Sequence, residues 1–155
     1  MATPKRTLIL ADLVSTLQAI TVAGGFLTTV ARVERAPKTW QQVTGSQRPW
    51  ISVVAGQERP REQPGQYRIE FDVDLHCLVQ ASAEASKILA INNLRHDIRR
   101  AINLDQTRGA NPDVVGDRNA TMTNIRLYEI EDVEDATEGY LGVGLTVVYM
   151  EGAQG

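Results

Sequence analysis

The stretch YRIEFDVDLHCLVQ, residues 67–80, decides how the fold is interpreted. Its odd positions from Tyr67 to Val79 are all apolar, and its even positions are mostly polar or charged. Because successive side chains of a strand point to opposite faces, this alternation predicts a β-strand with one buried and one solvated face. At about 3.3 Å per residue the stretch spans roughly 46 Å, whereas typical strands have about 5–6 residues. The length of this strand needs a physical explanation.

The composition is that of an ordinary globular domain. The chain has 155 residues, of which 43% are hydrophobic and 23% charged, and its formal net charge is -3. These values predict a single domain over residues 1–155 and argue against disorder or a membrane span. A dedicated nucleic-acid binder usually has a basic surplus, so the acidic balance disfavours that class. Cys77 is the single cysteine, which excludes an internal disulfide and predicts a small buried hydrophobe on the apolar strand face.

Apolar periodicity and turn residues divide the rest of the chain into helices and strands. Ile9, Leu13, Leu17 and Ile20 recur at helical spacing, so the N-terminal segment is interpreted as an amphipathic helix and not as a leader peptide. The stretch 57–66 has two prolines, one glycine and no other apolar residue, which predicts an exposed loop. The complete predicted order is helix 4–21, strands 26–35, 50–56 and 67–80, helix 83–102, and strands 122–133 and 140–150.

These elements predict an α+β domain. Their hairpin-sized connections indicate a two-layer, mostly antiparallel sheet of about five strands, with two helices packed on one face, in the order α-β-β-β-α-β-β. Flexible loops are expected near residues 36–49, 56–66 and 103–120, and the C-terminus is expected to fray. Gly142 and Gly144 alternate inside the last strand and indicate a bend or the close approach of another backbone.

No catalytic or metal-binding constellation is predicted. His76 shares a strand face with Asp72 and Asp74. Neighbours on that face are about 6.6 Å apart at their Cα atoms, so a metal ion would need ligands from a second strand. We therefore expect no catalytic residues, no metal and no cofactor, and we interpret these side chains as a solvated face. The alternative is a small metal- or ligand-binding α+β enzyme that uses this polar face.

The length of the 67–80 strand predicts self-association. A globule of this size has a radius of gyration of about 15 Å and a diameter of roughly 39 Å, which a straight strand of about 46 Å would exceed. A projecting apolar face is unstable in water, and a neighbouring copy is the simplest cover. Tyr67, Ile69 and Phe71 are therefore predicted to form a subunit interface rather than core, together with Arg59 and Arg61 near the hairpin tip.

Six segments of the chain also resemble a known family, the tail terminator (tail completion) proteins of long-tailed bacteriophages. The resemblance extends from about residue 8 to residue 150 and depends on element order, size, the pattern V-x-x-G-x-E after a strand, and an aromatic end to the last strand. The segments are LADLVSTLQAI (10–20), GGFLTTVARVERAP (24–37), PWISVVAGQE (49–58), YRIEFDVDLHCLV (67–79), LRHDIRRAINLD (94–105) and YLGVGLTVVYM (140–150).

The resemblance implies a structural protein without catalytic residues. It implies an α+β fold whose copies form a homohexameric ring that caps the tail tube, ends tube polymerisation and offers a surface to a neck or head-completion protein. The implied location is the head-proximal end of the virion tail, after assembly in the host cytoplasm and without a membrane. A neck or head-completion protein is a related alternative.

A ring of this kind passes DNA through its lumen without binding it specifically. Acidic side chains suit such a lumen, because phosphates would bind to Lys and Arg. Glu70, Asp72 and Asp74 on the polar strand face are the candidates for the lining, and a sheet face simply exposed to solvent is the competing interpretation.

Overall fold

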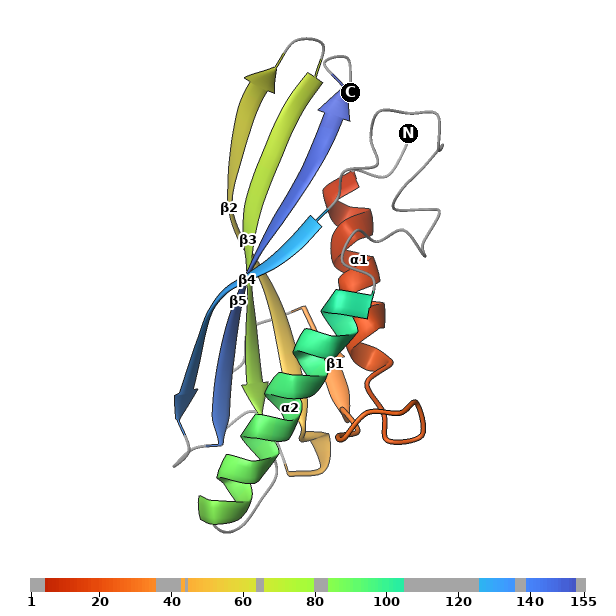
Figure 1. Cartoon of the computed structure of the whole chain (residues 1–155), viewed down its shortest axis with the longest axis vertical. Coiled ribbons are helices and arrows are strands. Elements are labelled where there is room, and N and C mark those ends of the chain that lie inside the picture. The colour runs from red at the N-terminus through yellow and green to blue at the C-terminus, as the bar shows by residue number, and fades with distance from the viewer. Residues whose placement is uncertain are drawn as a thin grey trace.

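The computed structural model describes residues 5–35, 43, 45–63, 66–79, 84–104, 126–135 and 139–152. Two helices and five strands confirm the predicted α+β class (Figure 1). In chain order the elements are α1 (Lys5–Gln18), β1 (Arg32–Glu34), the short 3-10 helix η2 (Gly45–Gln47), β2 (Trp50–Gln63), β3 (Gln66–Leu78), α2 (Glu84–Leu104), β4 (Arg126–Asp135) and β5 (Tyr140–Gly152).

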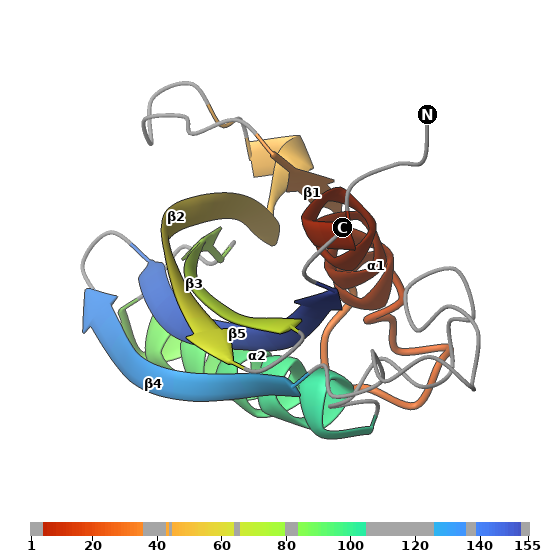
Figure 2. The ribbon, with the colours of Figure 1, turned by 90° about the horizontal axis from the view of Figure 1, so that it is seen from above.

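The strands form one mixed sheet in the order β1-β2-β3-β5-β4. β1 runs parallel to β2 over three residue pairs, and the other neighbours are antiparallel. β3 is paired over its full length on both sides, with β2 from Trp50 to Gln63 and with β5 from Tyr140 to Gly152. The long strand therefore has partners of matching length within its own chain. Seen from above, the strands are strongly twisted and curved (Figure 2).

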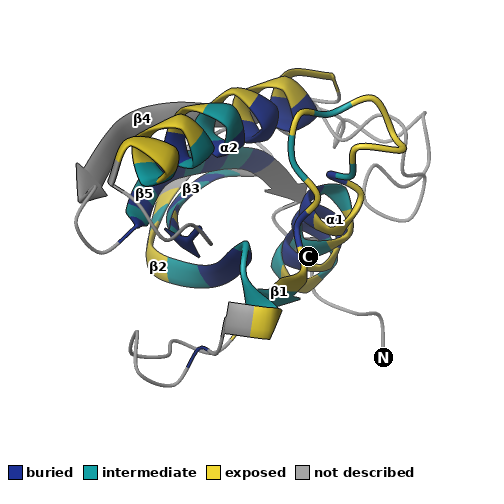
Figure 3. Ribbon diagram, turned by 90° about the horizontal axis from the view of Figure 1, so that it is seen from below, coloured by how far each residue is buried: buried dark blue, intermediate teal, exposed yellow. Residues whose placement is uncertain are grey.

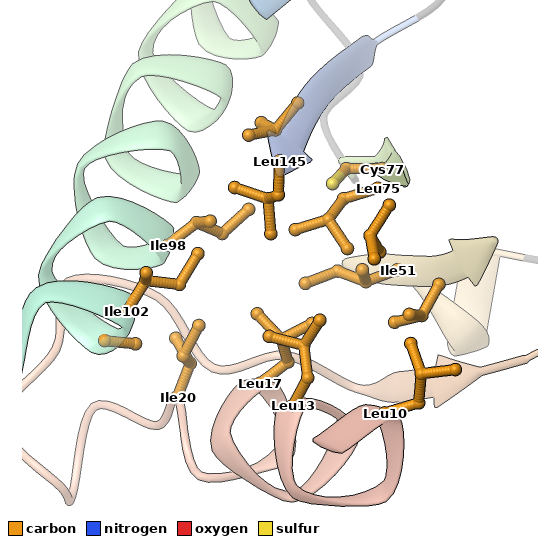
Figure 4. Close-up of a cluster of buried hydrophobic side chains, with 14 of the residues drawn as sticks. Leu10, Leu13, Leu17, Ile20, Ile51, Leu75, Cys77, Ile98, Ile102 and Leu145 are labelled. Carbon is orange, nitrogen blue, oxygen red and sulfur yellow. The ribbon is translucent and has the colours of Figure 1, made fainter. Parts of the chain in front are cut away.

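Both helices cover the same side of the sheet (Figure 1). Alternate side chains of β3 and β5 meet the apolar stripes of α1 and α2 in one core, as the sequence alternation predicts (Figure 4). Leu13, Leu17, Leu75 and Ile98 are fully buried there. Cys77 belongs to the same core, as predicted. α2 is buried on the side toward the sheet and exposed on the other side (Figure 3).

β2 continues far beyond its predicted end at Gly56. Residues 58–63, which we expected to form a loop, pair with residues 66–71 of β3. Prolines are compatible with this strand because β1 pairs only with residues 50–52, so the outer edge of β2 meets no other described strand from Val53 onward. Pro60 lies opposite Ile69 on this edge, where a missing N–H group is tolerated. The loop prediction was wrong because the pairing partner, and not the local composition, determines the conformation.

β1 is shorter than the predicted strand over residues 26–35. Side chains of α2 satisfy the backbone of the preceding loop: the Asp97 carboxylate accepts hydrogen bonds from the N–H groups of Leu27 (3.1 Å) and Thr28 (2.7 Å). Arg100 donates to the carbonyl of Gly25 at 2.6 Å. These bonds replace a strand ladder, so the loop stays irregular. Of the loop expected near residues 36–49, residues 45–47 form η2, and of the loop expected near 103–120, residues 103–104 belong to α2. At the C-terminus, where fraying is expected, β5 continues to Gly152. Residues 36–42, 105–125 and 153–155 lie outside the described residues.

Candidate functional site

A β-bulge in β2 decides which side chains reach the polar, helix-free face of the sheet. Ala55 pairs with Val73 and Glu58 pairs with Phe71, so two residues of β2 oppose one residue of β3 between these pairs. Because one extra residue reverses the alternation, Arg59 lies opposite Glu70 on the polar face, whereas Glu58 faces the helix side. The sequence prediction placed Arg59 in a loop and therefore missed this arrangement.

The bulge brings Arg59 to the carboxylate of Asp72. Two nitrogens of the Arg59 guanidinium donate to the two carboxylate oxygens at 2.9 and 3.0 Å, and the Thr146 hydroxyl donates to Oδ1 at 3.3 Å. The hydrogen bonds from Arg59 hold the pKa of Asp72 below its ordinary value, although burial opposes the shift. Glu70 is bound by Arg68 at 2.7 Å and lies 3.9 Å from Arg59.

This network includes two of the three predicted lumen residues. Of the three acids, Glu70 and Asp72 are neutralised by arginines of the same hairpin. Asp74 is exposed, and the described residues form no ion pair with it. The three side chains share one face, as the alternation predicts, but that face is charge-balanced near the hairpin tip rather than uniformly acidic.

The predicted interface residues do not form one surface. Ile69 is 6% exposed and Phe71 is fully buried, so the expectation that they are interface rather than core is wrong. The reason is that α1 reaches them: the Arg6 guanidinium lies 4.6 Å from the centre of the Phe71 ring, and the edge of the Tyr149 ring packs against the same ring.

Arg6 also fixes the bulge. It donates to the carbonyl of Gly56 at 3.1 Å and approaches Glu58 at 3.4 Å. α1 therefore closes the core at the point where the hairpin changes its alternation. The side chains of Tyr67 and Arg61 lie outside the described residues, and Arg59 is on the opposite face from Phe71.

A pocket of about 200 Å³ lies farther along the polar face, between β3 and β5, and its lining residues are Asp74, Leu75, His76, Tyr140, Gly142, Val143 and Gly144. Gly144 pairs with Asp74 and Gly142 pairs with His76, so β5 contributes no side chains at these two positions. The Tyr140 hydroxyl is 2.7 Å from Nδ1 of His76. Burial, followed by the nearby Cys77 and Asp74, raises the pKa of Tyr140. The result is an open trough with a carboxylate, an imidazole and a phenol along its side.

The pocket was only partly visible in the sequence. His76 and Asp74 were recognised as neighbours on one face, and Gly142 and Gly144 were recognised as unusual. Tyr140 of the pocket was missed, and so was Thr146 of the Arg59–Asp72 network, because both roles depend on the register between β3 and β5. Residue alternation within a single strand does not specify that register. The signal that could have indicated the pocket is the pair of glycines on one face of an otherwise apolar strand.

Asp72 and Cys77 lie on opposite faces of β3, and both belong to the described part of the chain. Within it, no group of three or more His, Cys, Asp or Glu side chains is placed to hold a metal ion. Both oxygens of Asp72 are bound by Arg59, and burial raises the pKa of the Cys77 thiol, which keeps it protonated.

Comparison with known proteins adds no family assignment: no protein-family model and no curated protein matches this chain. Among the residues that the structure describes, no helix has the length and apolar character that crossing a membrane requires.

Proposed function

We propose that this protein is a phage tail terminator: a structural protein whose copies form a homohexameric ring on the head-proximal end of the tail tube. In this role one surface of the ring binds the last ring of tail tube protein and ends its polymerisation, and the opposite surface receives a neck or head-completion protein. The protein acts in the virion after assembly in the host cytoplasm. The resemblance of six segments to this family motivates the proposal.

One structural observation carries the proposal. The C-terminal ends of β2 and β5 and the N-terminal end of β3 lie side by side. Together they extend beyond the N-terminal end of α1 as a three-stranded platform (Figure 1). These strands have 14, 13 and 13 residues, which is more than twice the usual length of about 5–6. A core of this size does not need strands that outreach its helices, whereas a subunit that contacts neighbours along a tube axis does.

The β2 edge of the platform is protected against the addition of strands. The outer edge of β2 carries a bulge, Pro60 and the charged residues Glu58 and Arg59. Bulges, prolines and charges are the devices that prevent edge-to-edge pairing, and such pairing would produce open-ended aggregates. A closed ring requires instead two different surfaces that meet around a fixed rotation.

The charge-balanced end of the polar face suits a DNA channel. Arg59 and Arg68 are occupied by Asp72 and Glu70, so they hold phosphates less strongly than free arginines would. We therefore place Glu70 and Asp72, with their arginine partners, along the lumen that DNA crosses without specific binding.

The direct test is electron microscopy of the purified protein, alone and with polymerising tail tube protein. We expect closed rings, and tubes whose length is limited when the protein is added. In an infected host, loss of the protein should give overlong tubes. Tailless or leaking heads would indicate a neck or head-completion protein instead, and a protein that stays monomeric in the presence of tubes would refute the ring.

A further inference from the structure

The pocket between β3 and β5 is not explained by tube capping or DNA passage. It lies on the same face as the arginine network, but its acid is not neutralised within the described structure. Asp72 has Arg59 and Glu70 has Arg68, whereas Asp74 stands exposed at the side of the trough. In the strand register, Gly144 pairs with Asp74 on one side and with Glu131 of β4 on the other.

The construction of the pocket favours a cationic side chain as its ligand. Gly142 and Gly144 leave space next to the backbone of β5. The Tyr140 ring lies over Gly142, where an added Cβ would be 2.7 Å from the hydroxyl and 3.3 Å from two ring atoms. The bond to His76 holds this ring in place. A fixed aromatic ring beside a carboxylate is the combination that binds a guanidinium group through cation–π and charge-assisted contacts.

Among the arginines whose side chains the structure describes, one suits this role. The exposed arginines of the described residues are Arg32, Arg35, Arg99 and Arg100. Arg32 pairs with Glu34, Arg100 binds Gly25 and stacks on Phe26, and Arg99 also has an interaction within the chain. Arg35 is the member of this group for which the described structure provides no contact.

The positions of Arg35 and the pocket suit a head-to-tail contact. Arg35 directly follows β1, which is one edge strand of the sheet. The pocket lies over β3 and β5, and β4, the other edge strand, is next to β5. We propose that the Asp74–Tyr140 pocket receives the Arg35 side chain of a neighbouring copy. One surface follows the edge strand β1 and the other lies over β3 and β5 on the polar face, and two such different surfaces form the heterologous contact that generates a ring when the rotation closes. This inference depends on the proposed ring, and it assigns Asp74 to the subunit boundary and not to the lumen.

A charge exchange tests the contact. Asp74→Arg and Arg35→Asp are compared with the double variant and with wild type by sedimentation over a range of concentrations, and Asp74→Asn removes the charge at nearly constant size. We expect each charge reversal to weaken association by at least about tenfold, and the double variant to recover most of that loss. Arg99→Asp is the matched control, because it makes the same charge change on α2 and should leave association unchanged.

The results separate this contact from the ring itself. Recovery in the double variant supports the contact, provided that circular dichroism shows each variant to be folded. Rings of wild-type strength in both single variants, or a double variant no better than the singles, would overturn the pocket contact while leaving the ring intact. Wild-type protein that never forms rings, even with tail tubes present, would overturn the proposed function and this contact together.

Discussion

The two faces of β3 come from the same thirteen residues, yet different parts of the protein complete them. On the helix side, the side chains from Ile69 to Cys77 are covered within the chain by α1, α2 and the neighbouring strands. On the polar side, arginines of the hairpin neutralise Glu70 and Asp72, and Asp74 borders an open pocket. Regular apolar alternation thus identifies the face that folds the subunit, and the polar positions between contain the features available to partners.

The largest expected effect comes from the closed face. Phe71→Ala removes a fully buried ring that contacts Arg6 and Tyr149, and we expect it to lower the free energy of unfolding by about 3–5 kcal/mol. Urea denaturation of the purified protein measures the loss. Ile69→Val is the graded control, with an expected loss of about 0.5–1.5 kcal/mol. An unchanged stability of the free subunit together with weaker assembly would contradict this prediction. It would mean that the Phe71 side chain is exposed in the free subunit and is buried only when copies associate.

The contrast between the faces also shows what residue order can and cannot predict. Alternation located β3 within two residues of its ends, because burial on one face requires side chains at every second position. It did not predict the second half of β2, because 57–66 has no apolar residue other than proline, and its conformation comes from pairing with β3. Non-local pairing of this kind has little signal in the segment itself.

The bulge explains why the candidate site was harder to predict than the fold. A single extra residue after Ala55 sends Arg59 to the polar face and Glu58 to the helix side, so every assignment beyond it depends on one local irregularity. The overlong strand was likewise interpreted as needing a sister copy, whereas β2 and β5 supply partners of nearly equal length. The length therefore concerns the platform as a whole and not one strand.

An intermediate effect is expected where the pocket is filled. Gly142→Ala places a Cβ about as close as 2.7 Å to the Tyr140 hydroxyl in the present geometry, so the ring must move away from His76. We expect a loss of about 1–2 kcal/mol in the free energy of unfolding, near the lower end for overpacking, because the ring lies at the surface of the sheet. Chemical denaturation measures the loss, and the NMR signals of the His76 ring report the broken contact.

A double variant sharpens this prediction. In the Tyr140→Phe background the closest atom is absent, so Gly142→Ala should be less destabilising than in the wild type, and the two changes should not be additive. Strict additivity would mean that Tyr140 does not lie over Gly142 in solution.

The smallest effect is expected at the neutralised acid. Asp72→Asn removes the charge but keeps the shape, and the side chains of Arg59 and Asp72 are 40% and 34% exposed, so solvent screens the pair. We expect a slight decrease in the urea midpoint near neutral pH. Hydrogen bonds from Arg59 lower the pKa of Asp72 in the folded state, so its contribution to stability is present above the unfolded value of about 3.9 and disappears as the pH falls through the folded pKa.

The stability difference between wild type and Asp72→Asn should therefore be constant around neutral pH, shrink on acidification below about pH 3.9, and also shrink in about 1 M salt. Denaturation curves recorded over a pH series measure this directly. A difference that grew toward acid pH would contradict the assigned direction, because it would require a folded-state pKa above the unfolded one. Asp74→Asn is the matched comparison on the same strand face: with no arginine bound within the described subunit, it should leave the midpoint of the free protein nearly unchanged and act only when copies associate.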